Sequence, residues 1–487
     1  MNHESYISIV RAGCTSYPGK ETYFRPSTKY PEYLFEELSS EKNAVYDAVR
    51  ESLHLLGLDE EHYGSAEWNP LGEMVHPGMH VLIKPNLVLH YNKNLSGGTE
   101  CLYTQPSVVA PIIDYVLIAL QGSGQVIIGD APLQECNFEK LIQESGYASL
   151  LSYYQEKNIT IDLVDFRGLK SRVKNGIIYT EITQNENGTI VDLGPFSEFA
   201  SEDQAAINRM RVTNYDPRVL SRHHNTEKHE YYISNYVLDA DVIINMPKPK
   251  THRKAGVTIS LKNFVGANVR KEFLPHHTMG AISEGGDEYE KKSLTQKIRS
   301  YLADKENICL ANKHVGMARL CLTGIHVCSG ILWLKRERYT EGSWHGNHTI
   351  SRTVVDLNKI IYYADKKGNL QAQKTRNVLI VADMIISGEG EGPIYPSPKP
   401  IGFIASGINP ICFDEIICTL MGFSAEKIPT IYCAKNICSP FVLEGKGQIP
   451  IIRSNDPRFE GKDIYALNPK DLFYFKPTDG WSGHIER

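Results

Sequence analysis

The fold of this chain is limited above all by an apolar run that ends abruptly in a basic loop. Four of the six residues at 241–246 are apolar, and Pro247 and Pro249 prevent the run from continuing. The run predicts a buried strand, and in an open α/β sheet ligands lie beyond the carboxyl ends of the strands. Because residues 247–263 carry one histidine and five cationic side chains, we expect the chemistry in this loop.

Apolar segments of strand length alternate with segments of helical spacing along most of the chain. This alternation is typical of a parallel sheet. The predicted fold class is α/β, with mostly parallel sheet layers flanked by helices. We expect strands at 6–11, 79–83, 125–129, 241–246, 378–383 and 401–406, and helices at 41–56, 106–120, 294–322 and 413–421, with a further helix and strand within 151–165.

The length of 487 residues exceeds one ordinary core, so two lobes are expected. Residues 1–165 would form an N-terminal α/β lobe and residues 236–487 a second α/β lobe that contains the basic loop. Between them, short β-like pieces separated by Asn, Gly and Glu predict a β-rich insertion or cap at 166–235.

The composition is that of a folded protein, with 41% hydrophobic and 22% charged residues. The net charge of −5 gives no global attraction to nucleic acid or to an anionic membrane. The first residues lack the pattern of a secretory signal, and we find no run of about 18 apolar residues. The expectation is a cytoplasmic protein without nucleic-acid or membrane partners, and a homo-oligomer is compatible with the sequence.

The ten cysteines are scattered and contain no C-x-x-C pair. A disulfide scaffold, a zinc ribbon and a ferredoxin-type iron–sulfur cluster therefore lack their usual spacing. The thiols are expected to be reduced and buried. The cofactor stays unknown at this point, with a divalent metal left open.

Polar residues follow two of the predicted strands. Lys84 and Asn86 stand in IKPN, where a phosphate or carboxylate would suit a cation beside an amide. Asp130 stands in GDAP, where a carboxylate can hold a metal or take a proton. Alternatively, Lys84 forms a salt bridge with a neighbouring loop, and Asp130 caps a helix or turn.

The basic loop supplies the central candidates. His252 can transfer a proton near neutral pH, and Lys262 can hold an anion or an enolate. Lys248, Lys250 and Asn263 are candidate substrate-binding residues in the same segment. The alternative is that the lysines form a solvated face, although the prolines and Gly256 predict a shaped turn.

Other candidates are spread over the second half of the chain. His276 and Asp287, near SEGGDEYE, are candidate metal ligands, as are Asp383, Glu389 and Glu391 in the segment DMIISGEGE. Arg352 is a candidate substrate-binding residue behind a Trp-His-Gly turn. A dinucleotide or P-loop nucleotide site is not indicated, because neither glycine fingerprint is present.

Several motifs resemble those of the uncharacterised family called domain of unknown function 362. They are IKPNLV (83–88), GDAP (129–132), INMPKPKTH (244–252), SLKNFVGA (260–267), LPHH (274–277), GEGEGP (388–393) and the expected helix at 409–422. Many members carry an appended ferredoxin module that this chain lacks, which weighs against electron transfer. The spacing of His252, Gly256 and Lys262 is also similar to that of lactate racemases with a nickel-pincer cofactor, which would imply proton transfer by the histidine and anchoring by the lysine.

The hypothesis from the sequence is an enzyme that binds an anionic carboxylate or phosphate compound in a cleft between two lobes. His252, Lys262 and Asp130 would carry acid/base chemistry, assisted by a metal if one binds. The reaction class, isomerase or transferase, is left open. The alternatives are a non-catalytic ligand-binding or assembly protein, and a racemase-like enzyme with a nickel-pincer type of cofactor.

Overall fold

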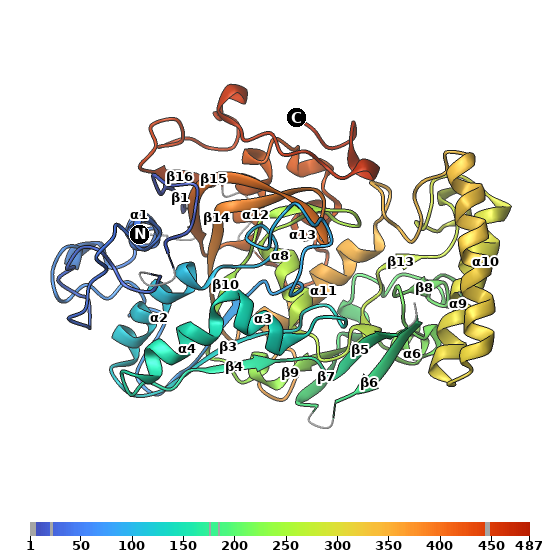
Figure 1. Cartoon of the computed structure of the whole chain (residues 1–487), viewed down its shortest axis with the longest axis horizontal. Coiled ribbons are helices and arrows are strands. Elements are labelled where there is room, and N and C mark those ends of the chain that lie inside the picture. The colour runs from blue at the N-terminus through green and yellow to red at the C-terminus, as the bar shows by residue number, and fades with distance from the viewer. Residues whose placement is uncertain (1–5, 20–22, 175–176, 184–185, 444–448) are drawn as a thin grey trace.

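A large central sheet organises the chain (Figure 1). The computed structural model describes residues 6–19, 23–174, 177–183, 186–443 and 449–487. The sheet has ten strands, two of which (β11, Lys250–His252, and β12, Gly256–Thr258) lie off the main path. The main order is β16 (Ile451–Ser454), β1 (Tyr6–Arg11), β15 (Tyr395–Gly407), β14 (Asn377–Glu391), β10 (Val242–Met246), β2 (His80–Pro85), β3 (Gln125–Asp130) and β4 (Asp162–Asp165).

Five neighbouring strands of this sheet are parallel, from β14 through β10, β2 and β3 to β4. Their carboxyl ends therefore meet at one edge, where the pairing places Asn245 beside Lys84. The hairpin partner β15 runs antiparallel to both β14 and β1. The predicted α/β class with a mostly parallel sheet is confirmed.

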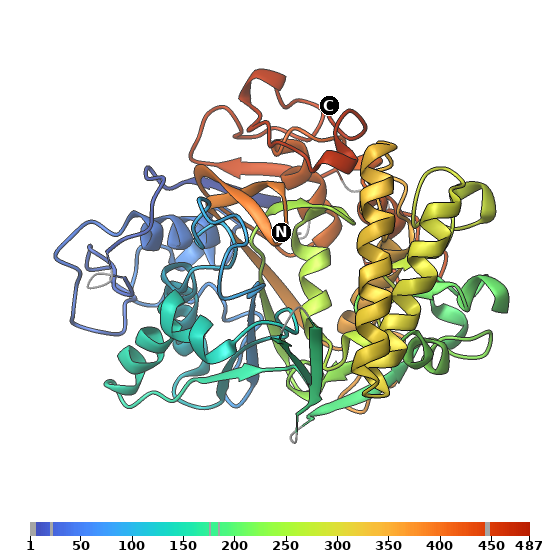
Figure 2. The ribbon, with the colours of Figure 1, turned by 45° about the vertical axis from the view of Figure 1, so that its right-hand side comes forward.

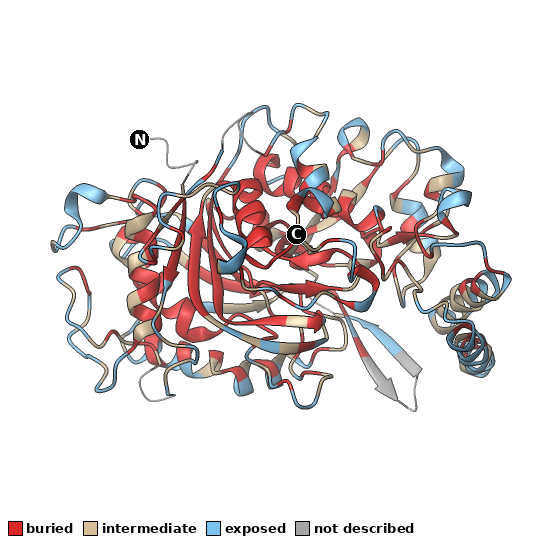
Figure 3. Ribbon diagram, turned by 90° about the horizontal axis from the view of Figure 1, so that it is seen from above, coloured by how far each residue is buried: buried red, intermediate tan, exposed pale blue. Residues whose placement is uncertain are grey.

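Alternate residues of the central strands enter cores on opposite faces, because successive strand side chains point to opposite sides. Ile244 packs in the core with α1 (Ala44–Leu55) and α2 (Pro106–Leu120), whereas Ile243 packs in the core with α11 (Thr349–Tyr363). A third core holds α12 (Pro410–Leu420) against β1 and β15. Figure 3 shows the sheet and these helices as buried.

The remaining elements are short and surround the sheet. Residues 166–235 contain β5 (Leu169–Lys174), β6 (Ile177–Ile182), β7 (Gly188–Asp192), α5 (Gln204–Ile207), β8 (Met210–Arg211), α6 (Pro217–His223) and β9 (Glu230–Ser234), with α7 (Asn235–Leu238) at the boundary. Elsewhere lie α3 (Phe138–Ser145), α4 (Tyr147–Gln155), α8 (Ser260–Asn263), β13 (His277–Thr278) and α13 (Pro429–Lys435). The strands of 166–235 form separate two-stranded pairs, outside the central sheet.

The segment expected to be one helical stretch is instead an antiparallel pair that projects from the body (Figure 2). Its helices are α9 (Leu294–Ala311) and α10 (Val315–Leu334), separated by a turn in which Lys313 has φ 61°. Within the described ranges, α10 is long and apolar enough to cross a membrane by length and composition, and 28% of its apolar window is buried. The expectation that no such run exists missed α10, because Arg319, His326 and several Gly, Thr and Ser residues interrupt its apolar side chains.

The expected division into two α/β lobes does not correspond to separate sheets. The strand β10, assigned to the second lobe, pairs with β2 of the first, and β1 pairs with β15 and β16 near the other end of the chain. Backbone hydrogen bonds thus join the two expected lobes through one sheet, so the candidate site lies at a sheet edge and not in an interlobe cleft.

Candidate functional site

Two buried ion pairs lie at the carboxyl ends of the parallel strands. Lys84 Nζ lies 2.7 Å from Asp130 Oδ1, and Lys248 Nζ lies 2.8 Å from Asp383 Oδ2. All four side chains are almost inaccessible to solvent, so each charge depends on its partner. Asp130 also accepts the backbone N–H of Leu87. These residues, proposed separately from the sequence, therefore form two neutral pairs.

A chain of amides connects β10 and β2 to the basic loop. Asn263 Nδ2 donates to Asn245 Oδ1 at 2.7 Å, and Asn86 Nδ2 donates to Asn263 Oδ1 at 3.1 Å. Lys250 Nζ then donates to Asn86 Oδ1 and to the carbonyl of Leu102. The network fixes the position of Lys250, yet it provides dipoles and no negative charge.

His252 is held by the turn that follows it. The backbone N–H groups of Lys254 and Ala255 both donate to Nδ1, at 3.0 and 3.1 Å. A nitrogen that accepts two N–H groups carries no proton, so the neutral ring has its proton on Nε2. Burial, and secondarily Lys262 and Arg253, lowers the pKa of His252 well below its usual value. The neutral ring is thus arranged to donate from Nε2.

Four lysines in this region have no carboxylate partner among the described residues. Lys254 donates to Thr213 Oγ1 and Lys271 to the carbonyl of Pro132, both at 2.7 Å, while Lys250 contacts only an amide and a carbonyl. Lys262 Nζ makes no hydrogen bond or ion pair with any described residue. Lys250 and Lys254 are buried, and Lys262 and Lys271 are partly exposed.

The pKa values of these lysines respond to burial and to one another. Burial, together with Lys248 and Lys262, lowers the pKa of Lys250 to about 7. Burial and Lys254 lower the pKa of Lys262 to about 8. Burial is also the largest cause that lowers the pKa of Lys254 to about 8 and the pKa of Lys271 to about 7. Glu341 partly offsets this effect at Lys254, and Asp130 does so at Lys271, whereas neighbouring lysines lower the pKa values of Lys250 and Lys262. The four amines therefore lie close enough to influence one another or the same charges.

Gly266, in the VGA segment after Lys262, leaves room for the first ion pair. A Cβ atom there would lie 1.9 Å from Asp130 Oδ1 and 2.8 Å from Lys84 Nζ. A larger residue would displace the carboxylate, so this position requires the absence of a side chain. The backbone carbonyl of Gly266 also accepts the N–H of Ala131, which ties the basic segment to the GDAP loop.

The sequence prediction missed several members of the site. Tyr17 donates to Asp383 Oδ1 at 2.7 Å and accepts from Lys248, although it lies far away in the sequence. Asn245 was assigned only to the strand, and Lys271 was not selected. Lys254 was noted only as part of a possible solvated face, and its burial marks it as more than that.

Other sequence candidates lie outside this cluster. Arg352 pairs with Glu202 and lies over the ring of Phe199 at 4.6 Å. Asp287 accepts the backbone N–H groups of His348 and Thr349 and so fixes the start of α11. These contacts give both side chains a structural role away from the lysine cluster.

The five candidate metal ligands do not come together. Glu389 accepts the N–H of Lys476, Glu391 accepts that of Asp479, and Asp383 belongs to its ion pair with Lys248. His276 contacts the carbonyl of Leu274 through Nδ1. Over the ranges that the structure describes, no group of three or more His, Cys, Asp or Glu side chains is placed to hold a metal ion.

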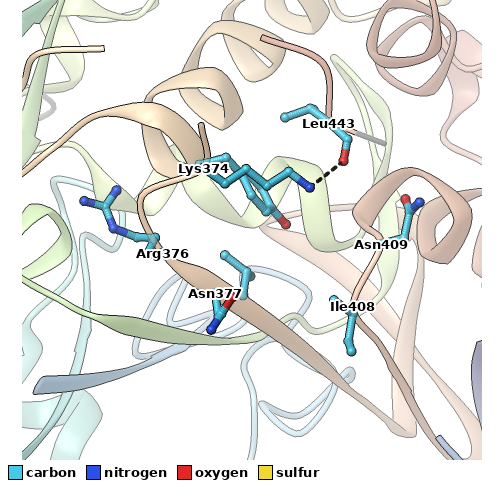
Figure 4. A pocket seen from close by; sticks show the side chains of 8 residues that line it. Lys374, Arg376, Asn377, Ile408, Asn409 and Leu443 are labelled. Atoms are coloured by element: carbon cyan, nitrogen blue, oxygen red, sulfur yellow. Dashed lines mark hydrogen bonds between the residues drawn. The ribbon is translucent and has the colours of Figure 1, made fainter. Parts of the chain in front are cut away.

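Two hollows lie outside the lysine cluster. Figure 4 shows the smaller, of about 70 Å³, at the amino end of β14 among Lys374, Arg376 and Asn409. The larger, of about 610 Å³, is lined in part by Glu135 and Arg167 and borders the loop after β3. Neither hollow is lined by the four unpaired lysines.

A family model places the chain among known sequences. The model described as domain of unknown function (DUF362) matches residues 81–184 and 196–419, which include both ion pairs and the whole basic loop. The chain belongs to the DUF362 family. In this DUF362 protein, four of the motifs that carried the resemblance, IKPNLV, GDAP, INMPKPKTH and SLKNFVGA, supply residues of the strand-end cluster.

Two further similarities are more limited. A thylakoid-associated protein of Synechocystis sp. is 26% identical over 196 residues, which is 40% of this chain and 41% of that protein. A crystal structure of a protein from Thermotoga maritima aligns with 73% of this chain and 54% of its own, at 9% identity and a TM-score of 0.27, too low to carry an argument. Neither is named as a racemase, so that likeness stays a prediction.

Proposed function

We propose that this protein binds an anionic small molecule, a carboxylate or phosphate compound, at the carboxyl ends of β2, β3 and β10. The observation that carries the proposal is the cluster of four lysines without carboxylate partners. Buried charges are normally paired, and an unpaired amine responds by a lowered pKa. An anion would supply the missing charge and raise all four pKa values together.

The arrangement of His252 refines its proposed role. With Nδ1 occupied by two backbone N–H groups, the ring would donate a hydrogen bond from Nε2 to a bound oxygen. In an enzyme, such a neutral donor would stabilise negative charge that develops on the substrate. It would keep its Nε2 proton, because loss of that proton from a neutral ring would leave an imidazolate. A ligand-binding protein without turnover would use the same contact for affinity alone.

Thermal unfolding in the presence of small anions tests the proposal. Inorganic phosphate, pyrophosphate, malonate and citrate at pH 7 are compared with chloride at equal ionic strength. We expect at least one to raise the unfolding midpoint, because a ligand at 100 times its Kd adds about 2.7 kcal/mol to the free energy of unfolding. The exposed Lys367→Ala variant should respond like the unmodified protein. Equal midpoints in all four anions and chloride would contradict the proposal.

A further inference from the structure

The outer face of the α9–α10 hairpin is apolar and uncovered. One side of α10 packs inward through Ala318, Cys321, Ile325, Cys328 and Leu332, at the spacing of three and four residues that a helix pair needs. A second stripe of apolar residues, displaced by one position along α10, is exposed to solvent. The exposed apolar side chains of the hairpin, each 40–75% accessible, are Leu294, Ile298, Tyr301, Met317, Leu320, Val327, Ile331, Trp333 and Leu334.

No described segment of the chain covers this face. Figure 3 shows the hairpin end-on at the margin of the molecule, with its outer surfaces exposed, while the sheet and its helices are buried. Exposed apolar side chains of this number on one hairpin point to contact with another molecule or with lipid.

The hairpin and the residues that flank it are basic. Residues 291–338 contain ten Lys and Arg against three Asp and Glu, a net charge of +7 in a chain whose total is −5. Four of the cations pair with carboxylates outside that range, and those pairs are Lys291–Glu290, Lys297–Glu284, Arg299–Glu341 and Arg338–Asp479. The others form no ion pair with a described residue.

The free charges and the most exposed apolar residues meet at one end of the hairpin. Lys335 Nζ reaches Thr295 Oγ1 at 3.4 Å, so the end of α10 lies beside the start of α9. This end carries the exposed cations Lys292, Lys335 and Arg336 next to Leu294, Trp333 and Leu334, which are 71–75% accessible. We call these six residues the hairpin tip.

We propose that the hairpin tip binds the surface of an anionic phospholipid membrane, with the tryptophan and two leucines inserted among the headgroups. Tryptophan and basic side chains together suit the membrane–water interface. A second copy of the chain would place two basic hairpins against each other, which charge repulsion opposes, whereas anionic lipid complements the charge. The hairpin rests on the surface without crossing it, because α9 carries Lys297, Arg299, Asp304, Lys305 and Glu306.

The protein contains an internal reporter for this contact. Of its four tryptophans, Trp68, Trp344 and Trp481 are at most 1% accessible, and only Trp333 is exposed. Vesicles of phosphatidylcholine with about one third phosphatidylserine should therefore shift the tryptophan emission to the blue and protect it from acrylamide. Vesicles of phosphatidylcholine alone should bind at least tenfold more weakly. The Trp333→Phe variant should show no emission shift.

Vesicle sedimentation of matched variants distinguishes the contribution of charge to membrane binding from that of apolar insertion. The double variant Lys335→Gln with Arg336→Gln should weaken partition into the mixed vesicles roughly 30-fold. The reason is that it removes two basic charges, each of which contributes to the free energy of binding at an anionic surface. Lys367→Gln with Lys470→Gln, at exposed sites elsewhere, should leave partition within twofold. Leu334→Ser should weaken partition, and Leu95→Ser, at a 93% accessible position, should not.

Two results would overturn the proposal. The first is an absence of sedimentation with anionic vesicles at low salt, or equal partition of the tip and control variants. The second is an emission shift that follows protein concentration without vesicles, accompanied by a dimer in sedimentation equilibrium that Leu334→Ser dissociates. That second result would assign the face to a second copy of the chain.

Discussion

Asp130→Ala is expected to lower the free energy of unfolding by about 3–5 kcal/mol, because it leaves a buried charge without its partner. Lys84 is 0% accessible and has Asp130 as its ion-pair partner, and the variant also removes the acceptor of the Leu87 N–H. Urea denaturation at pH 6 and pH 9 measures the loss. It should be smaller at pH 9, because burial already lowers the pKa of Lys84 and a neutral amine tolerates burial better.

A double variant is the matched control for this loss. Lys84→Met with Asp130→Leu removes both charges and should recover much of the stability, since apolar residues can replace a buried ion pair. A loss below about 1 kcal/mol for Asp130→Ala alone would mean that Lys84 is not held as a cation by this carboxylate.

Lys262→Ala is expected to weaken binding of the best anion by at least 30-fold, about 2 kcal/mol or more. Lys262 Nζ makes no hydrogen bond or ion pair with a described residue, and its charge affects the pKa values of Lys250, His252 and Lys271. It is therefore the cation most available to a ligand. Isothermal titration calorimetry at pH 7 measures the change, with Lys367→Ala as the control that should bind like the unmodified protein.

The His252→Ala variant distinguishes an enzyme from a binder once an anion is known. In a binding protein it should change affinity by a factor of a few, the value of one hydrogen bond. In an enzyme it should abolish turnover while affinity changes no more than that. Unchanged affinity in Lys262→Ala would place the anion elsewhere and remove the basis for either role.

The positions of single strands and helices could be predicted, because each depends on a short stretch of sequence. The strands expected at 6–11, 125–129 and 241–246 and the helix expected at 106–120 lie within one residue of those bounds, and each is bounded by proline, glycine or a charged residue. Strand order was not predictable in the same way. The pairing of β10 with both β2 and β14 depends on contacts between distant segments, and this pairing is what removes the expected boundary between two lobes.

Individual residues of the site were predicted from the sequence, but the ion pairs between them were not. Lys84 and Asp130 were both placed at strand ends, yet only the parallel order brings them to 2.7 Å. Tyr17 could not be identified, since nothing near it in the sequence indicates contact with Asp383. The carboxylates of the GEGE segment were expected to bind metal, whereas they accept backbone N–H groups from the C-terminal segment.

Proton uptake on anion binding is the decisive measurement for the proposed lysine site. Titrations at pH 7.5 in two buffers of different ionisation enthalpy give the number of protons taken up per bound anion. In the free protein, lysines with a pKa of about 7 to 8 are partly deprotonated at this pH. A bound anion raises the pKa values of these lysines. The affinity for the anion is therefore highest below pH 7, where the lysines are already protonated, and it falls as the pH rises through 8. We expect net uptake of protons at pH 7.5. Binding without proton uptake, or no binding, would mean that these lysines do not hold the anion.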